Sequence, residues 1–99
     1  MTYRVRVRRA AELDIASAIE WYESQQVGLA SEFLDEFEKI MAYLGSEPRM
    51  FPEKYRGVRR AVLHRFPYLV WYRIDALHVD ILACTHCKVD PDSIPDQIS

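Results

Sequence analysis

Residues 57–75 read GVRRAVLHRFPYLVWYRID, and this stretch decides the expected fold. Two runs rich in β-branched and aromatic residues, Val58–His64 and Tyr68–Ile74, flank the corner Arg65-Phe66-Pro67. Because proline has no N–H to donate to a sheet ladder, we expect the bend at this corner, with one strand on each side. The stretch therefore predicts two neighbouring strands of an antiparallel meander.

Two further strands are expected outside this stretch. Tyr3–Arg8 alternates apolar and basic residues, which is the pattern of a strand with one buried face. His78–Thr85 is rich in apolar residues and follows Tyr68–Ile74 after a three-residue connection, so we expect it to be the last strand of the meander.

Two amphipathic helices are expected between the first strand and residue 46. Apolar residues recur three and four positions apart in residues 11–25 and again in residues 33–44, and Gly45 is the expected C-cap of the second helix. Gly28 breaks the chain between the two stretches. So short a connection predicts an antiparallel helical hairpin.

Together these elements predict a single α+β domain over residues 1–99. The expected order is an N-terminal strand, the helical hairpin and a three-stranded antiparallel meander, with the helices packed on one face of a four-stranded sheet. Residues 46–57 are expected to form a loop, and residues 90–99 a frayed tail. Because the helices cover one face of the sheet, we expect the opposite face to be the functional one.

The net charge of −2 hides a strong partition along the chain. Residues 10–47, which include both predicted helices, carry nine acidic residues and one lysine, whereas residues 48–73 carry seven basic residues and one glutamate. Strands of one small sheet can gather such charge into a patch. We take the target-binding residues to be Arg59, Arg60, Arg65, Arg73 and Lys88.

The composition excludes several classes of protein. A hydrophobic content of 49% with three glycines indicates a packed globule rather than a disordered chain. No apolar run approaches the roughly 20 residues of a membrane span, and residues 1–9 lack the hydrophobic region of a signal peptide. We therefore expect a cytoplasmic protein that does not contact a membrane.

Cys84 and Cys87 are the two cysteines of the chain. We expect both to be reduced thiols, at least one of them in the core, so no metal and no other cofactor is expected. A zinc half-site that combines these thiols with His64 and His86 is the weaker alternative, because strong zinc signals contain two such ligand pairs.

The order of these residues resembles the RelE/ParE family, the toxins of bacterial type II toxin–antitoxin pairs. The resemblance runs from about Arg9 to Pro91 and favours the ParE-like side of the family. The residues that carry it are Asp14-Ile15, Trp21-Tyr22, Gly28-Leu29, Phe33-Leu34, Pro48, Phe51-Pro52, Arg59-Arg60, Arg65-Phe66-Pro67-Tyr68, Tyr72, Val79–Ala83, His86 and Asp90-Pro91. It implies a cognate antitoxin, encoded by the adjacent gene, as partner. We take Trp21, Tyr22 and Trp71 to be the antitoxin-binding residues.

The resemblance leaves the activity open, and with it the question of whether the chain is an enzyme. The favoured interpretation is a ParE-like toxin that inhibits DNA gyrase by binding, without catalysis. The alternative is a RelE-like, ribosome-dependent mRNA endoribonuclease, whose acid, base and phosphate-binding groups would come from Arg60, Arg65, His64, His86 and Tyr72.

Two departures from the family pattern bear on this choice. Relatives commonly carry an arginine where this chain has Val89, and RelE-type nucleases use several lysines, whereas this chain has three in all. Both departures favour the gyrase interpretation over the nuclease. The missing arginine also leaves a third interpretation open, a non-toxic relic or a binding module of the same fold.

Overall fold

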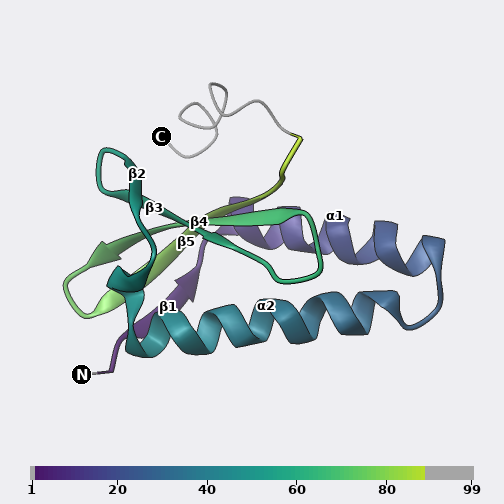
Figure 1. Ribbon diagram of the computed structural model, residues 1–99, viewed down its shortest axis with the longest axis horizontal. Helices are drawn as coiled ribbons and strands as arrows, with labels where there is room; N and C mark the ends of the chain where they lie inside the picture. The colour runs from purple at the N-terminus through teal and green to yellow at the C-terminus, as the bar shows by residue number, and fades with distance from the viewer. Residues whose placement is uncertain (1, 89–99) are drawn as a thin grey trace.

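The computed structural model describes residues 2–88, which form two helices and five strands (Figure 1). In chain order the elements are β1 (Arg4–Val7), α1 (Arg9–Gln25), α2 (Leu29–Ser46), the short 3₁₀ helix η1 (Pro48–Met50), β2 (Glu53–Tyr55), β3 (Val58–Val62), β4 (Tyr68–Asp75) and β5 (His78–His86). The predicted tail at residues 90–99 and Val89 lie outside the described residues. No helix in the described part of the chain is long and apolar enough to cross a membrane.

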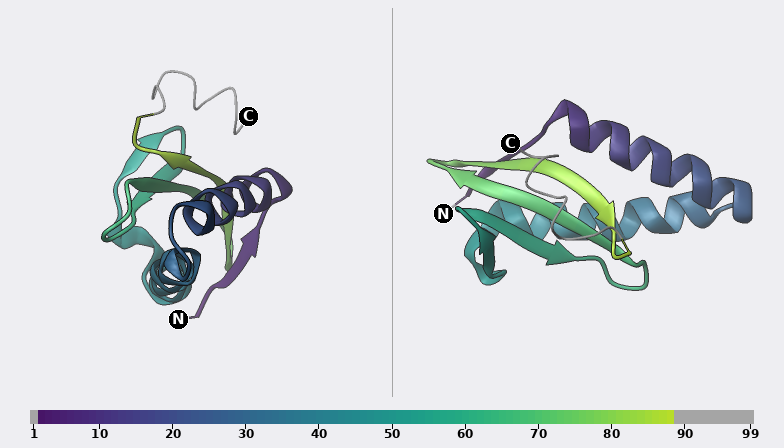
Figure 2. Two further views of the ribbon diagram at one scale, coloured as in Figure 1. Left: turned by 90° about the vertical axis from the view of Figure 1, so that its right-hand side faces the viewer. Right: turned by 90° about the horizontal axis from the view of Figure 1, so that it is seen from above.

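The strands form one mixed sheet in the order β1-β5-β4-β3-β2. β3, β4 and β5 are the expected antiparallel meander, and β1 pairs in parallel with β5, where Arg4 lies opposite His78 and Val7 lies opposite Ile81. Both helices lie on one side of this sheet, as the two views of Figure 2 show. The predicted α+β architecture is confirmed.

The strand count differs from the prediction, because the sheet has five strands where four were expected. The additional strand, β2, lies inside the stretch predicted as a loop and pairs with β3 through a tight connection in which Arg56 and Gly57 have φ values of 38° and 82°. Its three residues are all exposed and include no alternating apolar pattern, so the sequence contained no periodic signal for a strand there.

The end of α2 also differs from the prediction. Gly45 lies inside the helix, which continues to Ser46 and has Glu47 as its C-cap. The Gly45 carbonyl accepts a hydrogen bond from the backbone N–H of Tyr3 (N···O distance 2.8 Å), so this turn of α2 is attached to the residue just before β1. Gly45 therefore occupies a contact between the helix and the chain entering the sheet, rather than a left-handed cap.

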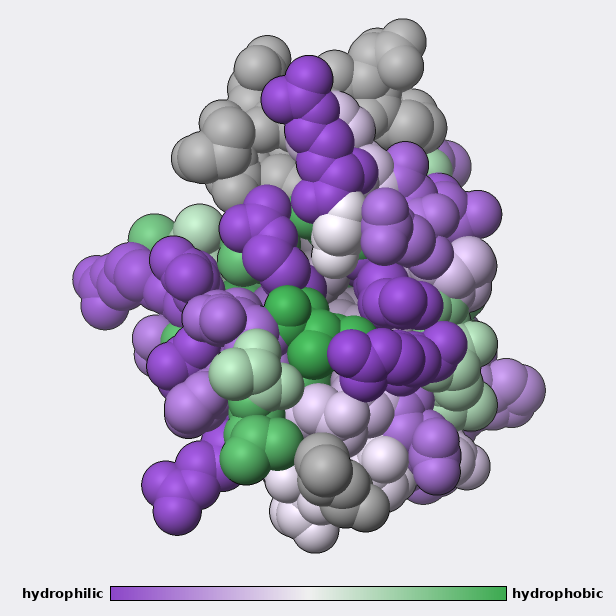
Figure 3. All heavy atoms as spheres, turned by 90° about the vertical axis from the view of Figure 1, so that its left-hand side faces the viewer, coloured by the Kyte–Doolittle hydropathy of each residue, from purple (hydrophilic) through white to green (hydrophobic). Residues whose placement is uncertain are grey.

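The main core lies between the helices and the sheet, and most of the surface seen in Figure 3 is hydrophilic, with a small hydrophobic area near its centre. The face of α2 that packs inward contributes Phe33, Phe37 and Leu44, all buried, as the predicted helical stripe required. Phe33 has no exposed surface, and its ring packs against those of Tyr22 and Phe66 with centroid distances of 5.4 Å. This aromatic group joins the far end of the hairpin to the corner between β3 and β4.

The register assigns each strand residue to one of the two faces of the sheet. Ala61, Val70 and Tyr72 belong to the core under the helices, whereas Val58, Trp71 and Ala83 form a second cluster on the opposite side. We call the side opposite the helices the open face. Strand residues alternate between faces, and a register shift opposite Trp71 and Tyr72 puts Leu82 and Ala83 of β5 on the same side. The open face therefore carries Arg4 and Arg6 of β1, Val58, Arg60 and Val62 of β3, Leu69, Trp71 and Arg73 of β4, and Asp80, Leu82, Ala83 and Thr85 of β5.

Candidate functional site: the open face and the turn-side end of the sheet

The centre of the open face is a small apolar cluster built on Trp71. The indole packs with Val58, Leu82 and Ala83, and its N–H donates a hydrogen bond to Thr85 Oγ1 (Nε1···Oγ1 distance 2.9 Å). Only 4% of Trp71 is exposed. The tryptophan therefore forms the floor of this face and does not protrude from it.

Two arginines lie over and beside this cluster. Arg60 is opposite Trp71 in the β3–β4 ladder, and its guanidinium carbon lies 5.7 Å from the centroid of the indole ring, within range of a cation–π contact. Arg73 is exposed and lies opposite Val58 on the same face. Among the described residues, neither guanidinium forms a salt bridge. Arg73 is thus exposed to solvent, and the half-buried Arg60 lies beside it over the same apolar floor.

The register adds arginines in and just after β1 that are not among the predicted target-binding residues. Arg6 binds Asp80 of β5 with two hydrogen bonds, Nε···Oδ1 at 2.6 Å and Nη2···Oδ2 at 3.1 Å, and Arg8 reaches the same carboxylate at 3.4 Å. The hydrogen bond from Arg6 is the main reason that the pKa of Asp80 is lowered. Arg4, also on the open face, is exposed. The alternation of arginines in the first strand was visible, but only the pairing of β1 with β5 places them here.

Arg59 has a different role from its neighbour Arg60. Its Nη1 donates hydrogen bonds to the carbonyl oxygens of Phe51 (2.6 Å) and Arg49 (3.3 Å), in the segment that leads into β2. The Tyr72 hydroxyl donates to the Pro48 carbonyl at 2.6 Å in the same segment. Burial raises the pKa of Tyr72 to about 12. Arg59 and Tyr72 therefore fix this segment to the sheet, and Tyr72 is enclosed rather than presented to a substrate.

The remaining candidate residues lie where the chain passes from β3 to β4 and where β5 ends. We call this region the turn-side end and define it by His64, Arg65, His86 and Lys88. The backbone N–H of Cys87 donates to the Pro67 carbonyl at 2.8 Å, which joins the corner between β3 and β4 to the end of β5. The His86 ring packs against Tyr68 with a centroid distance of 5.3 Å.

Two of these residues have local partners that fix them. Arg65 adopts a positive φ of 74°, and its Nη2 lies 3.4 Å from Glu32 Oε1 of α2. The His86 Nδ1 accepts a hydrogen bond from the Lys88 backbone N–H at 3.0 Å. The structure thus gathers four of the proposed target-binding or catalytic residues at this end, whereas Arg60 belongs to the open face and Tyr72 to the core.

The three proposed antitoxin-binding aromatics have different surroundings. Trp21 is 55% exposed, Tyr22 is buried against Phe33 and Phe66, and Trp71 is the floor of the open face. Trp21 borders a hollow of about 370 Å³ at the turn-side end, which Asp14 also lines. Burial raises the pKa of Asp14, whose Oδ2 accepts a hydrogen bond from the Cys84 backbone N–H at 2.9 Å.

The two cysteines are free thiols with opposite exposure. Cys84 is buried, which raises the pKa of its thiol to about 12, and Cys87 is exposed. The expectation that at least one thiol belongs to the core is confirmed. Among residues 2–88, no group of three His, Cys, Asp or Glu side chains is arranged to hold a metal ion.

A match to a protein-family model identifies the family of the chain. The family model for the ParE toxin of the type II toxin–antitoxin system parDE matches residues 5–91. The chain belongs to this family. The predicted resemblance to RelE/ParE toxins, and to the ParE-like side in particular, is confirmed.

Individual relatives of this ParE-family toxin agree with that result. The chain is 27% identical over 100 residues to toxin ParE2 of Mycobacterium tuberculosis, an alignment that covers 100% of this chain and 95% of the relative. Its fold matches a chain of the chromosomal ParDE toxin–antitoxin system of P. aeruginosa with a TM-score of 0.76 and 18% identity, over 86% of this chain and 96% of that one. It also matches a chain of the M. tuberculosis toxin–antitoxin complex RelBE2 with a TM-score of 0.59 and 23% identity, over 87% and 99% of the two chains.

Proposed function

We propose that this ParE-family toxin inhibits DNA gyrase in the cytoplasm by binding through its open face, without catalysing a reaction. The observation that carries the proposal is the placement of Arg60 and Arg73 beside the Trp71 cluster, with no salt-bridge partner among the described residues. An apolar centre bordered by arginines is the composition of a protein-binding hot spot.

The floor of the face makes Arg60 a well-defined contact group. The Trp71 ring is held by its hydrogen bond to Thr85 and supports the guanidinium from below. A supported side chain loses less conformational freedom on binding than a mobile one, so more of its interaction energy contributes to affinity. Arg73, which is exposed, adds charge that accelerates association with an acidic surface.

A supercoiling assay tests the target. Purified toxin is added to gyrase and relaxed plasmid, and the supercoiled product is measured across a toxin titration up to micromolar concentration. We expect supercoiling to fall or cleaved DNA to accumulate. Gyrase that remains fully active would refute this target, and normal growth of a bacterial host that expresses soluble protein would favour the non-toxic relic instead.

We further propose that a cognate antitoxin, encoded by the adjacent gene, covers the same face with an acidic segment that folds on binding. Acidic residues of that segment would pair with Arg60 and Arg73, and its apolar residues would lie on the Trp71 cluster. Association should then slow as salt is added, because charge attraction sets the association rate. Co-expression with the neighbouring gene followed by affinity purification tests this partner, and failure of the two products to co-purify would contradict it.

One observation favours a second candidate function, the ribosome-dependent mRNA endoribonuclease. His64, Arg65, His86 and Lys88 gather at the turn-side end, where imidazole and cationic groups could serve acid–base and phosphate-binding roles. Primer extension on translated mRNA decides between the two. Codon-phased cuts that disappear in His86→Ala would support the nuclease, and an absence of cuts with active gyrase inhibition would exclude it.

A further inference from the structure

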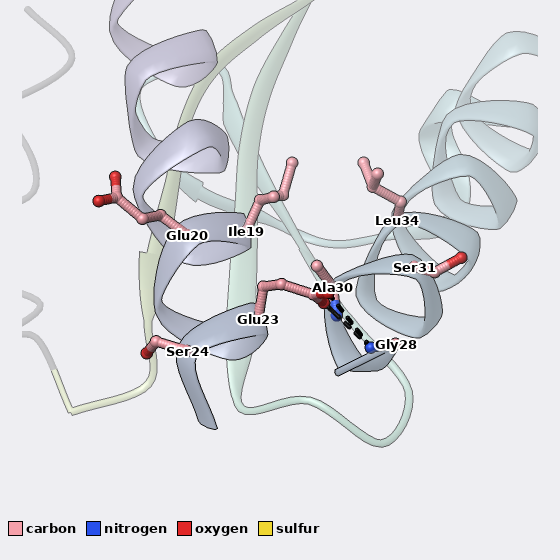
Figure 4. Close-up of a pocket in the computed structure, with 8 residues that line it drawn as sticks. All are labelled: Ile19, Glu20, Glu23, Ser24, Gly28, Ala30, Ser31 and Leu34. Carbon is pink, nitrogen blue, oxygen red and sulfur yellow. Dashed lines mark hydrogen bonds between the residues drawn. The ribbon is translucent and has the colours of Figure 1, made fainter. Parts of the chain in front are cut away.

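The helical hairpin has its own surface hollow, and no arginine is among the residues that line it. A groove of about 700 Å³ lies between Ile19, Glu20 and Glu23 of α1 and Ser31 and Leu34 of α2, and we call it the hairpin groove. In Figure 4 the side chains of Ile19 and Leu34 extend into the space between the two helices. Leu34 is half-buried and does not belong to the main core. It therefore offers apolar surface that the fold itself does not use.

The groove continues along α1. A second hollow of about 450 Å³ is lined by Val7, Glu12 and Ile15 and shares Ile19 with the first. Ile15 and Ile19 are one helical turn apart, so they form a continuous apolar track. From Glu12 to Glu23 the helix rises about 16 Å, the length of a three-turn helix. The size and the spacing fit a partner helix with apolar residues at positions i, i+3 or i+4, and i+7.

The walls of the groove are acidic and one of them is rigid. Oε1 and Oε2 of Glu23 accept hydrogen bonds from the Gly28 backbone N–H at 3.1 and 3.4 Å, and Oε1 accepts another from the Ala30 N–H at 3.4 Å (Figure 4). These bonds attach the end of α1 to the start of α2 and fix the closed end of the groove. Glu12 and Glu20 are exposed along the same helix.

The charge of the hairpin identifies the kind of partner. Residues 10–47 carry nine acidic residues against Lys39, and Lys39 is already paired with Glu36 at 3.2 Å. A second copy of this chain would bring equally acidic helices, because its basic residues lie mainly on strands and turns. We propose that the hairpin groove binds a basic amphipathic helix of a partner protein, whose apolar stripe covers Ile15, Ile19 and Leu34 while its lysines or arginines face the hairpin acids. This site is separate from the open face and does not depend on the gyrase or antitoxin proposals.

Synthetic peptides test the proposal directly. The probe is a fluorescein-labelled, alanine-based helix of about three turns with leucines at i, i+4 and i+7 and lysines flanking them. One comparison peptide has glutamates in place of the lysines, and another has alanines in place of the leucines. With the whole chain, we expect anisotropy to report saturable binding of the basic peptide and at least about tenfold weaker binding of either comparison peptide.

Variants of the chain locate the binding. Ser31→Arg is exposed, so it should leave the fold intact while placing bulk and a like charge in the groove, and it should weaken binding at least about tenfold. Leu34→Arg should do the same, with Leu13→Arg as matched control, because Leu13 is 54% exposed and lies outside both hollows. Circular dichroism confirms that each variant is folded.

Three results would overturn the assignment. One is equal affinity for the lysine and glutamate peptides, and another is undiminished binding to folded Ser31→Arg. The third is an NMR map in which the basic peptide shifts amide signals near Arg60 and Arg73 and leaves those of Ile19, Ser31 and Leu34 unchanged. Loss of gyrase inhibition or of antitoxin binding in other experiments has no bearing on these measurements.

Discussion

Arg59 and Arg60 are neighbours in β3, yet they lie on opposite faces of the sheet and have different surroundings. Arg59 donates hydrogen bonds to two backbone carbonyls that precede β2, whereas Arg60 lies over the Trp71 ring at the surface. The face under the helices contains the large aromatic core, and the open face contains a small cluster with cationic side chains around it. The comparison shows that the face of the sheet decides whether an arginine holds the fold together or is available to a partner.

The largest expected effect is on the core side of this comparison. Phe33→Ala removes a fully buried ring that packs against Tyr22, Phe66 and Tyr68, and should lower the free energy of unfolding by about 3–5 kcal/mol. Tyr43→Ala is the matched aromatic control on the same helix, because Tyr43 is 54% exposed and its loss should cost less than about 0.5 kcal/mol. Urea unfolding measures both. Equal stability of the two variants would show that the helices do not form the core described here.

The next largest loss of stability is expected from breaking the Arg6–Asp80 ion pair at the border of the open face. Asp80→Asn removes a buried carboxylate that accepts hydrogen bonds from Arg6 and Arg8, and should lower the free energy of unfolding at neutral pH by about 1–3 kcal/mol. The lowered pKa of Asp80 fixes the sign of the pH dependence. Its contribution is present above the ordinary aspartate pKa of 3.8 and is lost as pH falls through the lower folded-state pKa.

Unfolding at pH 7 and near pH 3 checks this sign. The difference in the free energy of unfolding between the parent and Asp80→Asn should become smaller as the pH falls. Asp14 contributes a pH dependence of opposite sign, because its pKa is raised. Its contribution favours the folded state at low pH and is lost as pH rises through the folded-state pKa. An Asp80→Asn variant whose stability deficit grows on acidification would contradict the role given to the Arg6–Asp80 pair.

A smaller difference in stability is expected between variants that remove an arginine from one face of the sheet or from the other. Arg59→Ala leaves the Phe51 carbonyl without its charged donor and should cost about 1–2 kcal/mol, whereas Arg73→Ala removes an exposed side chain and should change stability by less than about 0.5 kcal/mol. Thermal unfolding resolves the two, since 1 kcal/mol corresponds to roughly 4–8 °C in a domain of this size. Equal melting temperatures would remove the distinction between the faces.

The sequence predicted the elements that repeat a pattern and missed those that do not. The helices and the strands β3, β4 and β5 bury one or both faces, so their apolar residues recur at regular spacing. That spacing predicts where these elements lie. β2 is three exposed residues whose pairing with β3 depends on the Arg56–Gly57 turn, and no period marks it. Glycine often ends helices, which predicts a cap at Gly45, but α2 continues past this residue and its carbonyl accepts a hydrogen bond from the Tyr3 backbone N–H.

The candidate site was predictable in composition and less so in geometry. The excess of basic residues in residues 48–73 was visible in the sequence, as was their location on strands. The sequence could not show that Arg59 binds backbone carbonyls, that Trp71 forms the floor of the open face, or that Arg6 and Arg8 share Asp80, because each depends on contacts between distant segments. Such contacts are set by register and by the parallel pairing of β1 with β5, which local patterns do not specify.

The double variant Arg60→Ala, Arg73→Ala tests most directly the claim that the open face binds the target. Gyrase inhibition and thermal unfolding are measured on the same preparation, with Arg9→Ala as the control, because Arg9 is an exposed arginine at the start of α1. We expect a melting temperature within about 4 °C of the parent and at least about tenfold weaker inhibition, while the control inhibits normally. A folded double variant that inhibits gyrase as strongly as the parent would contradict target binding through the open face.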